Sequence, residues 1–123
     1  MAYFRCGSGK KPKIVIPSIS AGLPAGNDGI QVNFNMTIPC EEFKKLTIGS
    51  ISGGGYYGSR ISYTIRGEKP DGTYEYLEYY QTENRTVATE YDITDYVSVE
   101  WYDCRYYGGS YGFELSFKNV VFE

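Results

Sequence analysis

The sequence predicts a single all-β domain, built as an antiparallel β-sandwich of about eight short strands. Three observations lead to this prediction. Apolar and polar residues alternate with a period of two, most clearly over residues 30–38, and this period puts successive side chains on opposite faces of a strand. Glycine- and proline-containing turns separate the alternating segments. No segment keeps a helical period, and 123 residues are enough for one hydrophobic core.

The chain divides into an arm and a domain. Residues 1–12 contain Gly7, Gly9 and Pro12 and show no period, which predicts an extended N-terminal arm. Residues 13–123 then form the sandwich domain.

The first strand predicted in the domain covers residues 13–17 and ends at Pro17, and the glycine-rich residues 18–29 predict a loop. One helical turn is expected over residues 41–45. Pro70-Asp71-Gly72 predicts the turn of a hairpin, because proline presets the first turn position and glycine takes the left-handed one. The other strands are predicted over residues 30–38, 46–52, 61–65, 73–80, 86–93, 97–102 and 113–122.

Strand alternation also predicts the core. It puts Trp101 inside and Tyr102 outside, together with Glu100 and Cys104. The residues predicted to face the core are Val32, Phe34, Met36, Ile61, Ile65, Val99, Trp101, Leu115 and Phe117.

Charge is unevenly distributed along the chain. The formal net charge is −3, yet residues 1–13 carry four basic side chains and no acidic one. The acidic remainder argues against nucleic acid as the main ligand, because phosphate neutralisation dominates that affinity. A basic arm of this kind suits contact with nucleic acid, and docking on a partner protein suits it at least as well. The residues predicted to contact that partner are Tyr3, Phe4, Arg5, Lys10 and Lys11.

The N-terminus and the cysteines indicate the compartment. The opening residues have no long apolar segment, so we expect neither a signal peptide nor a membrane anchor. Synthesis in a reducing cytoplasm then predicts free thiols. Cys6, Cys40 and Cys104 lack metal-type spacing, and we expect Cys40 and Cys104 to be buried apolar fillers.

Two Tyr-Tyr-Gly segments are the main candidates for binding. Residues 55–59 and 105–110 each lead into an alternating strand. Tyrosine gives a large, stiff contact surface with a hydroxyl, and glycine and serine let a loop adapt, which is typical of binding loops on sandwich scaffolds. The alternative is that these tyrosines flank ordinary turns. The predicted ligand-binding residues are Tyr56, Tyr57, Tyr102, Tyr106, Tyr107 and Tyr111.

The sequence gives no support for catalysis, a cofactor or a metal. The chain has no histidine, which removes the commonest general base and metal ligand. Gly53-Gly54-Gly55 is not a phosphate-binding loop, since no Gly-Lys-Ser/Thr follows it. Asp92 and Asp95 flank a turn where aspartate more often caps backbone amides than binds calcium. We therefore expect a protein that is not an enzyme and has neither a cofactor nor a metal.

The ends of the chain resemble a known class of proteins. The opening MAYFRCGSG, with residues 91–96 (YDITDY) and 117–122 (FKNVVF), is similar to small proteins encoded among tail and fibre genes of phages and prophages of gut Firmicutes. The last third also resembles jelly-roll domains of the galactose-binding type. These resemblances imply a jelly-roll-like sandwich in a virion protein, made in the host bacterial cytoplasm.

Two functions follow as expectations. The first is a non-enzymatic structural or accessory protein of a phage or prophage particle. It assembles through its arm with other virion proteins or copies of itself, and its Tyr/Gly-rich loops bind protein or surface glycan. The second is a free carbohydrate-binding module. No membrane association is expected in either case.

Overall fold

The computed structural model describes residues 13–123, which form eight β-strands and no helix. The strands are β1 (Ile14–Leu23), β2 (Gln31–Pro39), β3 (Lys45–Ser52), β4 (Arg60–Glu68), β5 (Tyr74–Gln81), β6 (Thr89–Asp92), β7 (Ser98–Tyr107) and β8 (Phe113–Phe122). The predicted all-β class is confirmed. The predicted arm, with Tyr3, Phe4, Arg5, Lys10 and Lys11, lies outside the described residues.

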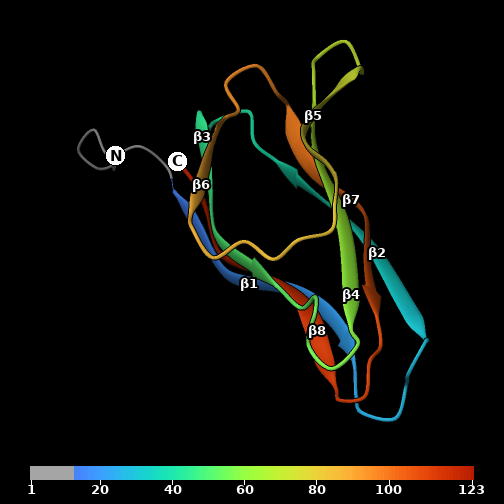
Figure 1. Cartoon of the computed structure of the whole chain (residues 1–123). Helices are drawn as coiled ribbons and strands as arrows, with labels where there is room; N and C mark the ends of the chain where they lie inside the picture. Colours follow the sequence, from blue (N-terminus) through green and yellow to red (C-terminus); the bar gives the residue numbers. More distant parts are fainter. Residues whose placement is uncertain (1–12) are drawn as a thin grey trace, which may run out of the picture.

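The strands pair as a long hairpin folded over itself. β1 pairs with β8, β2 with β7, β3 with β6 and β4 with β5, all antiparallel. Further pairing of β8 with β3 and of β7 with β4 produces two four-stranded sheets, β1-β8-β3-β6 and β2-β7-β4-β5. We name them the β8 sheet and the β7 sheet after a central strand of each. They form the two layers of a sandwich (Figure 1), and this pairing is that of a jelly roll.

An aromatic cluster around Phe117 of β8 joins the two sheets. Tyr63 and Trp101 of the β7 sheet meet the Phe117 ring edge-on, with centroids 5.4 and 6.2 Å away. All three side chains are at most 1% exposed. Edge-to-face pairs of buried rings stabilise a core beyond the area that they remove from water. The inward positions predicted for Ile61, Ile65, Val99, Trp101, Leu115 and Phe117 are confirmed.

On the outer strand β2 the predicted core is wrong at Met36, whereas Val32 and Phe34 face the core but are less buried than predicted. Met36 is 37% exposed, and Val32 and Phe34 are only partly buried. β2 is an edge strand of the β7 sheet, so its inward side chains lie at the rim of the sandwich. The Phe34 ring still reaches Phe117, at a centroid distance of 6.4 Å.

β1 is longer than predicted, because Pro17 does not end it. The strand runs on to Leu23, through residues predicted to be a loop. β1 is an edge strand of the β8 sheet. Proline is tolerated in edge strands, where its missing N–H need not break the ladder.

Three other boundaries also differ from the prediction. Residues 41–45 contain no helical turn, and the strand predicted over residues 86–93 is confined to Thr89–Asp92. β7 continues to Tyr107, well past its predicted end at Tyr102.

β7 contains a bulge that changes which side chains face the core. Phe34 and Met36 of β2 pair with Cys104 and Trp101, so β7 has one extra residue between these pairs. The same extra residue appears against β4, where Ser62 and Thr64 oppose Arg105 and Tyr102. Tyr102 and Asp103 therefore both face outward, and from Cys104 onward the alternation of inward and outward side chains is shifted by one position.

The bulge overturns the orientation predicted for Cys104. Strict alternation places this side chain outside with Tyr102, but it is completely buried. Asp103 adopts the left-handed conformation, with φ of 49°, which aspartate tolerates better than most residues. Its backbone N–H donates a hydrogen bond to the side-chain oxygen of Asn35, at 2.6 Å.

The two cysteines in residues 13–123 are free, buried thiols, as predicted for apolar fillers. Burial raises the pKa of Cys40 to about 11 and that of Cys104 to about 12. Neither thiol is therefore a reactive thiolate at neutral pH.

A polar cluster connects the open edges of the two sheets. The Arg85 guanidinium pairs with both carboxylate oxygens of Glu78 in β5, and the Tyr91 hydroxyl of β6 donates to Glu78 as well. Arg85 also exchanges two backbone hydrogen bonds with Ile51 of β3, at 2.7 and 2.8 Å. Burial acts to raise the pKa of Glu78, but the hydrogen bonds from Arg85 and Tyr91 outweigh it and hold the pKa below its ordinary value.

The first prediction concerns the core. Phe117→Ala should lower the free energy of unfolding by about 3–5 kcal/mol, because it removes the ring on which both sheets pack. Met36→Ala, on the exposed edge strand, should cost less than about 1 kcal/mol. Denaturant melts measure both values, and equal losses at the two sites would contradict this description of the core.

The second prediction concerns pH. Glu78→Gln should cost about 1–3 kcal/mol at neutral pH, because it removes a charge-assisted cluster that is largely shielded from water. Since the folded pKa of Glu78 lies below the ordinary 4.5, its contribution is complete above that pH and is lost as the pH falls through the folded pKa.

The measurement is a set of denaturant melts of both proteins between pH 3 and 7. The difference between wild type and Glu78→Gln should shrink below about pH 4.5. Glu90→Gln serves as a control, because Glu90 pairs with Lys45 at the surface and exposed pairs contribute little. A difference that stays constant down to pH 3 would exclude the ionised cluster as the cause.

Candidate functional site

The structure brings the two Tyr-Tyr-Gly segments together at one end of the sandwich. The β1–β2, β3–β4 and β7–β8 loops all lie at this end (Figure 1). The Ser110 N–H of the β7–β8 loop donates to the Tyr57 carbonyl of the β3–β4 loop, at 2.7 Å. The Gly108 N–H donates to the Ile30 carbonyl, also at 2.7 Å. Three loops that are distant in sequence therefore form one connected surface.

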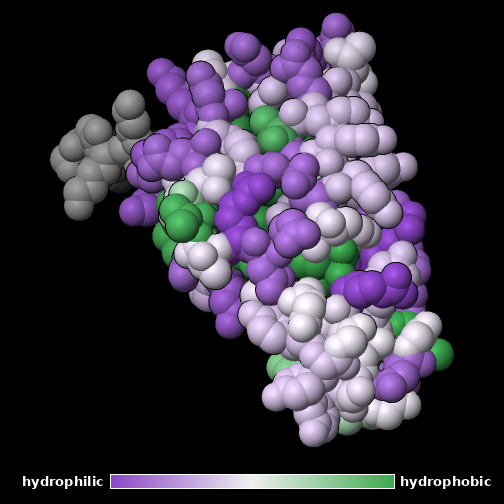
Figure 2. All heavy atoms as spheres, in the orientation of Figure 1, coloured by the Kyte–Doolittle hydropathy of each residue, from purple (hydrophilic) through white to green (hydrophobic). Residues whose placement is uncertain are grey.

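Aromatic rings form a patch on this surface. The Tyr57 ring lies 4.4 Å from the Tyr111 ring and is nearly parallel to the Phe113 ring at 6.0 Å. The Tyr56 ring packs on Phe113 at 5.6 Å. Tyr56, Tyr57 and Tyr111 are 44%, 61% and 55% exposed. We call Tyr56, Tyr57, Tyr111 and Phe113 the loop patch. Figure 2 shows this end mostly in the pale colours of weakly polar residues.

Gly109 allows the two loops to meet. A Cβ atom at this position would lie 2.4 Å from the Tyr57 carbonyl oxygen and 2.5 Å from the Ser59 nitrogen. Both distances are too short for any side chain, so glycine is required for the close approach of the backbones.

Tyr106 does not belong to the predicted binding surface. It is 1% exposed and packs in the core, because the bulge in β7 turns it inward. Tyr102 and Tyr107 do face outward, on the outer face of the β7 sheet rather than in the loops. Among the predicted tyrosines the structure thus joins three in the loop patch, places two on the sheet and buries one.

The outer face of the β7 sheet carries more tyrosines than the sequence analysis identified. Tyr74, Tyr76, Tyr79 and Tyr80 of β5 are each at least 43% exposed, and the Tyr76 and Tyr79 rings lie 4.8 Å apart. We call the outer face of this sheet the tyrosine face. Its tyrosines are Tyr74, Tyr76, Tyr79, Tyr80, Tyr102 and Tyr107. The signal was present in the sequence as a run of tyrosines over residues 74–80.

Arginines hold several of these rings in place. The Arg66 guanidinium lies between the Tyr74 and Tyr102 rings, 3.8 and 3.9 Å from their centroids, and pairs with Glu100 at 2.8 Å. Arg105 pairs with Asp103 at 2.6 Å and donates to the Tyr107 hydroxyl at 3.4 Å. Such stacked and paired arginines fix ring positions at little further entropic cost.

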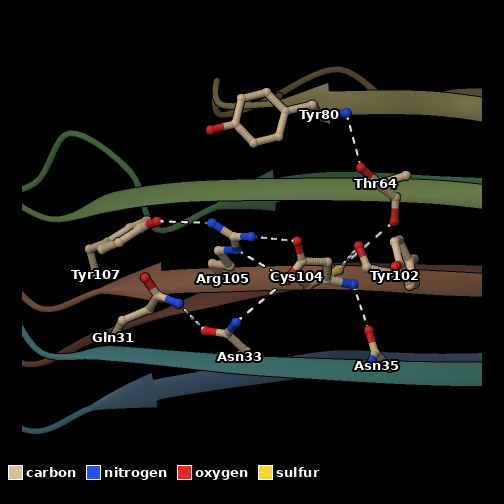
Figure 3. A network of polar contacts seen from close by, with 10 residues as sticks. Gln31, Asn33, Asn35, Thr64, Tyr80, Tyr102, Cys104, Arg105 and Tyr107 are labelled. Atoms are coloured by element: carbon tan, nitrogen blue, oxygen red, sulfur yellow. Dashed lines mark hydrogen bonds and ion pairs between the residues drawn. The ribbon is translucent and has the colours of Figure 1, made fainter.

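A line of polar contacts crosses the tyrosine face from β5 to β2 (Figure 3). The Tyr80 N–H donates to the Thr64 hydroxyl at 3.0 Å, because one of two register shifts in β5, between Glu78 and Gln81, takes Tyr80 out of the regular ladder. On the other side of β4, Arg105 and Tyr107 rise from β7, and the Gln31, Asn33 and Asn35 side chains follow on β2. This face is therefore ordered across all four strands.

A shallow groove of about 340 Å³ lies on the tyrosine face beside β4. Its lining includes Arg60, Ser62, Tyr80, Thr82 and Tyr107. We call it the tyrosine trough. The Ser62 side chain is 3% exposed, and its hydroxyl has no hydrogen-bond partner among the described residues.

The part of the chain that the structure describes does not contain a metal site. No group of three or more Asp, Glu, Cys or His side chains in residues 13–123 could hold an ion. Asp92 instead accepts a hydrogen bond from the Thr94 N–H at 2.9 Å, as a turn-capping aspartate does. Residues 13–123 also lack any helix long and apolar enough to cross a membrane.

Comparison with known proteins does not assign a family. No protein-family profile and no curated protein matches the sequence. Among solved structures, the chain aligns with one from infectious bursal disease virus (Gt strain) at 13% identity and a TM-score of 0.37, covering 94% of this chain and 33% of that one.

A mutant VP2 protein of the same virus, in derived T=1 particles, aligns at 13% identity and a TM-score of 0.40, over 99% of this chain and 33% of that one. The chain thus spans about a third of the length of these viral chains. A Bacillus endospore appendage, described as a disulfide-linked pilus, aligns at 11% identity and a TM-score of 0.36, over 98% and 96% of the two chains. These weak likenesses carry no argument about function, and the resemblance to phage tail and fibre proteins stays a prediction.

The third prediction concerns the loop patch. Gly109→Ala should push the β3–β4 and β7–β8 loops apart and cost about 1–3 kcal/mol, the usual penalty of overpacking. The contact between the Tyr57 and Tyr111 rings should be lost, which nuclear Overhauser effects between the two rings report. Gly55→Ala is the control for backbone strain without steric overlap, since a Cβ there meets no atom within 4 Å but φ is +82°; it should cost stability through that strain and still keep the ring contact. Retention of the contact in Gly109→Ala would contradict the assignment.

Proposed function

We propose that this chain is a non-enzymatic structural or accessory protein of a phage or prophage particle. In this proposal the N-terminal arm attaches the jelly roll to other virion proteins or to copies of itself. The loop patch and the tyrosine face then make the outward contacts, with protein or with surface glycan.

One observation carries the proposal: eight tyrosines are exposed in the loop patch and on the tyrosine face. They are Tyr56, Tyr57, Tyr74, Tyr76, Tyr79, Tyr80, Tyr102 and Tyr111. Tyrosine and arginine are the residues that contribute most to binding at protein interfaces. Exposed rings in this number favour a contact role, because aromatic residues are enriched at interfaces.

The composition of the arm supports attachment. Tyr3 and Phe4 offer two large apolar anchors within a segment rich in glycine. Arg5, Lys10 and Lys11 supply positive charge, whereas all the acidic residues of the chain lie in residues 13–123. Opposite charges of this kind steer association with an acidic neighbour, including another copy of the same domain.

A free carbohydrate-binding module is the second candidate. The observation that favours it is the tyrosine face, where aromatic rings lie beside the amides of Gln31, Asn33 and Asn35 (Figure 3). Rings stack on the apolar faces of sugars, and amides bind their hydroxyls. In a free module the arm has no role in assembly. Deleting the arm should therefore abolish assembly only if the chain is a virion protein.

The fourth prediction tests the arm. Deleting residues 2–11 should abolish incorporation into particles or oligomers and should change the domain stability by less than about 0.5 kcal/mol, since the described strands begin at Ile14. Mass spectrometry of purified particles and light scattering measure the assembly, and thermal melts measure the stability.

Two variants separate the contributions within the arm. Replacing Tyr3 and Phe4 by alanine removes the anchors, whereas replacing Arg5, Lys10 and Lys11 by glutamine removes only the charge. The first should prevent assembly at every ionic strength, and the second should slow it mainly at low salt. Normal assembly without residues 2–11 would refute the attachment role and favour the carbohydrate-binding module.

A further inference from the structure

Two polar groups that line the tyrosine trough lack a hydrogen bond or an ion pair within residues 13–123. One is the hydroxyl of Ser62, a lining residue, which is buried and has no hydrogen bond among the described residues. A buried hydroxyl without a partner is costly and uncommon. A ligand that fills the trough and offers a hydroxyl group would supply the missing hydrogen bond.

The second group is the Arg60 guanidinium. Residues 13–123 contain four arginines, and Arg66, Arg85 and Arg105 each pair with a carboxylate. Arg60 has no ion pair with any described carboxylate; it is exposed and stacks on the Tyr107 ring, 4.7 Å from the centroid. Its hydrogen-bonding edge therefore remains available for a ligand carboxylate.

The walls of the trough are preorganised. The Tyr80 backbone is held by the hydrogen bond from its N–H to the Thr64 hydroxyl, and the Tyr107 hydroxyl accepts one hydrogen bond from Arg105. The glycine loop beside them is fixed by Asn84, whose side chain exchanges two hydrogen bonds with the Gly54 backbone, at 2.8 and 2.9 Å. Walls that are already fixed lose little conformational entropy when a ligand binds.

The dimensions and chemistry of the trough restrict the ligand. A volume of about 340 Å³ is at the low end for small-molecule sites, which suits a single sugar ring. Hydroxyl groups of Ser62, Tyr80, Thr82 and Tyr107 suit a ligand rich in hydroxyls. The two tyrosine rings offer apolar surfaces for the C–H faces of a pyranose, and Arg60 provides one positive charge.

From this combination we infer that the tyrosine trough binds one acidic sugar residue, a hexuronate, within a surface glycan. The carboxylate pairs with Arg60, a ring hydroxyl binds Ser62, and the pyranose ring lies between Tyr80 and Tyr107. An acidic protein side chain would use Arg60 but would leave the Ser62 hydroxyl unpaired. The inference rests on the contact role proposed above for the tyrosine face.

The test is an NMR titration of the full chain with methyl glucuronoside, and with methyl glucoside as its neutral match. Glucuronoside should shift the amide signals of Ser62, Tyr80 and Tyr107 and bind roughly tenfold more tightly than glucoside, the effect of one well-placed ion pair. Arg60→Gln should abolish this preference. Ser62→Ala should weaken both ligands. Tyr76→Ser, on the same face outside the trough lining, should change neither.

Several outcomes would overturn the inference. They are equal binding of the two sugars, a preference that survives in Arg60→Gln, or an absence of shifts at the trough. Tighter binding of a glutamate-containing peptide would assign the trough to protein instead. Thermal melts of each variant exclude unfolding as the cause. The Arg60→Gln variant should assemble normally, and deletion of residues 2–11 should leave glucuronoside binding intact. Sugar binding therefore tests this inference, and assembly tests the virion role, independently of each other.

Discussion

The bulge in β7 decides which side chains of this strand face the core and which face the surface of the β7 sheet. β7 lies between β2 and β4, so its extra residue must be accommodated by both neighbours at once, opposite Asn35 on one side and Tyr63 on the other. Without it, strict alternation would turn Arg105 and Tyr107 into the core and expose Cys104 and Tyr106. One inserted residue thus decides that the core receives a thiol and a ring while the surface receives an arginine and a tyrosine.

The register shift in β5 between Glu78 and Gln81 shapes the other side of the tyrosine face. It lies on the opposite side of β4 from the bulge in β7, and Thr64 of β4 faces both: it pairs with Tyr102 of β7 and accepts a hydrogen bond from the Tyr80 N–H. Tyr80 adopts the left-handed conformation, with φ of 45°, which costs a residue other than glycine, asparagine or aspartate of order 1–2 kcal/mol. Backbone strain at an exposed tyrosine that lines a groove is consistent with a functional role for its position.

The sequence predicted the class of the fold because its signals are local. Alternation over residues 30–38 and the turn at Pro70-Asp71-Gly72 need no tertiary information. The continuation of β1 through Pro17 does depend on tertiary information, since only the position of β1 at a sheet edge lets the strand continue through proline. The shift in β7 is likewise set by two neighbouring strands, and nothing within residues 101–107 marks it apart from an aspartate that tolerates a positive φ.

The candidate sites also differ in how far the sequence alone could predict them. The two Tyr-Tyr-Gly segments were recognisable from their composition, but their contact depends on the jelly-roll pairing, which places the β3–β4 and β7–β8 loops at the same end. The tyrosine trough was not predictable from the sequence. Its lining comes mainly from β4, β7 and the end of β5. Its distinctive property is that, among the described residues, Ser62 has no hydrogen-bond partner and Arg60 no ion pair. Such an absence is a property of the packed structure and not of any motif.

The negative charge of the domain makes Arg60 more important for binding an acidic sugar than a single exposed arginine usually is. All 15 acidic residues but only nine of the 12 basic ones lie in residues 13–123, so this part of the chain has a formal charge of −6. An anionic sugar is repelled by such a surface at long range and is attracted only within a few ångströms of an unpaired cation. Because the Debye length is about 8 Å at physiological ionic strength, salt screens the general repulsion more than the direct contact with Arg60. Moderate salt should therefore weaken binding of an acidic glycan in the trough much less than it weakens association through the basic arm.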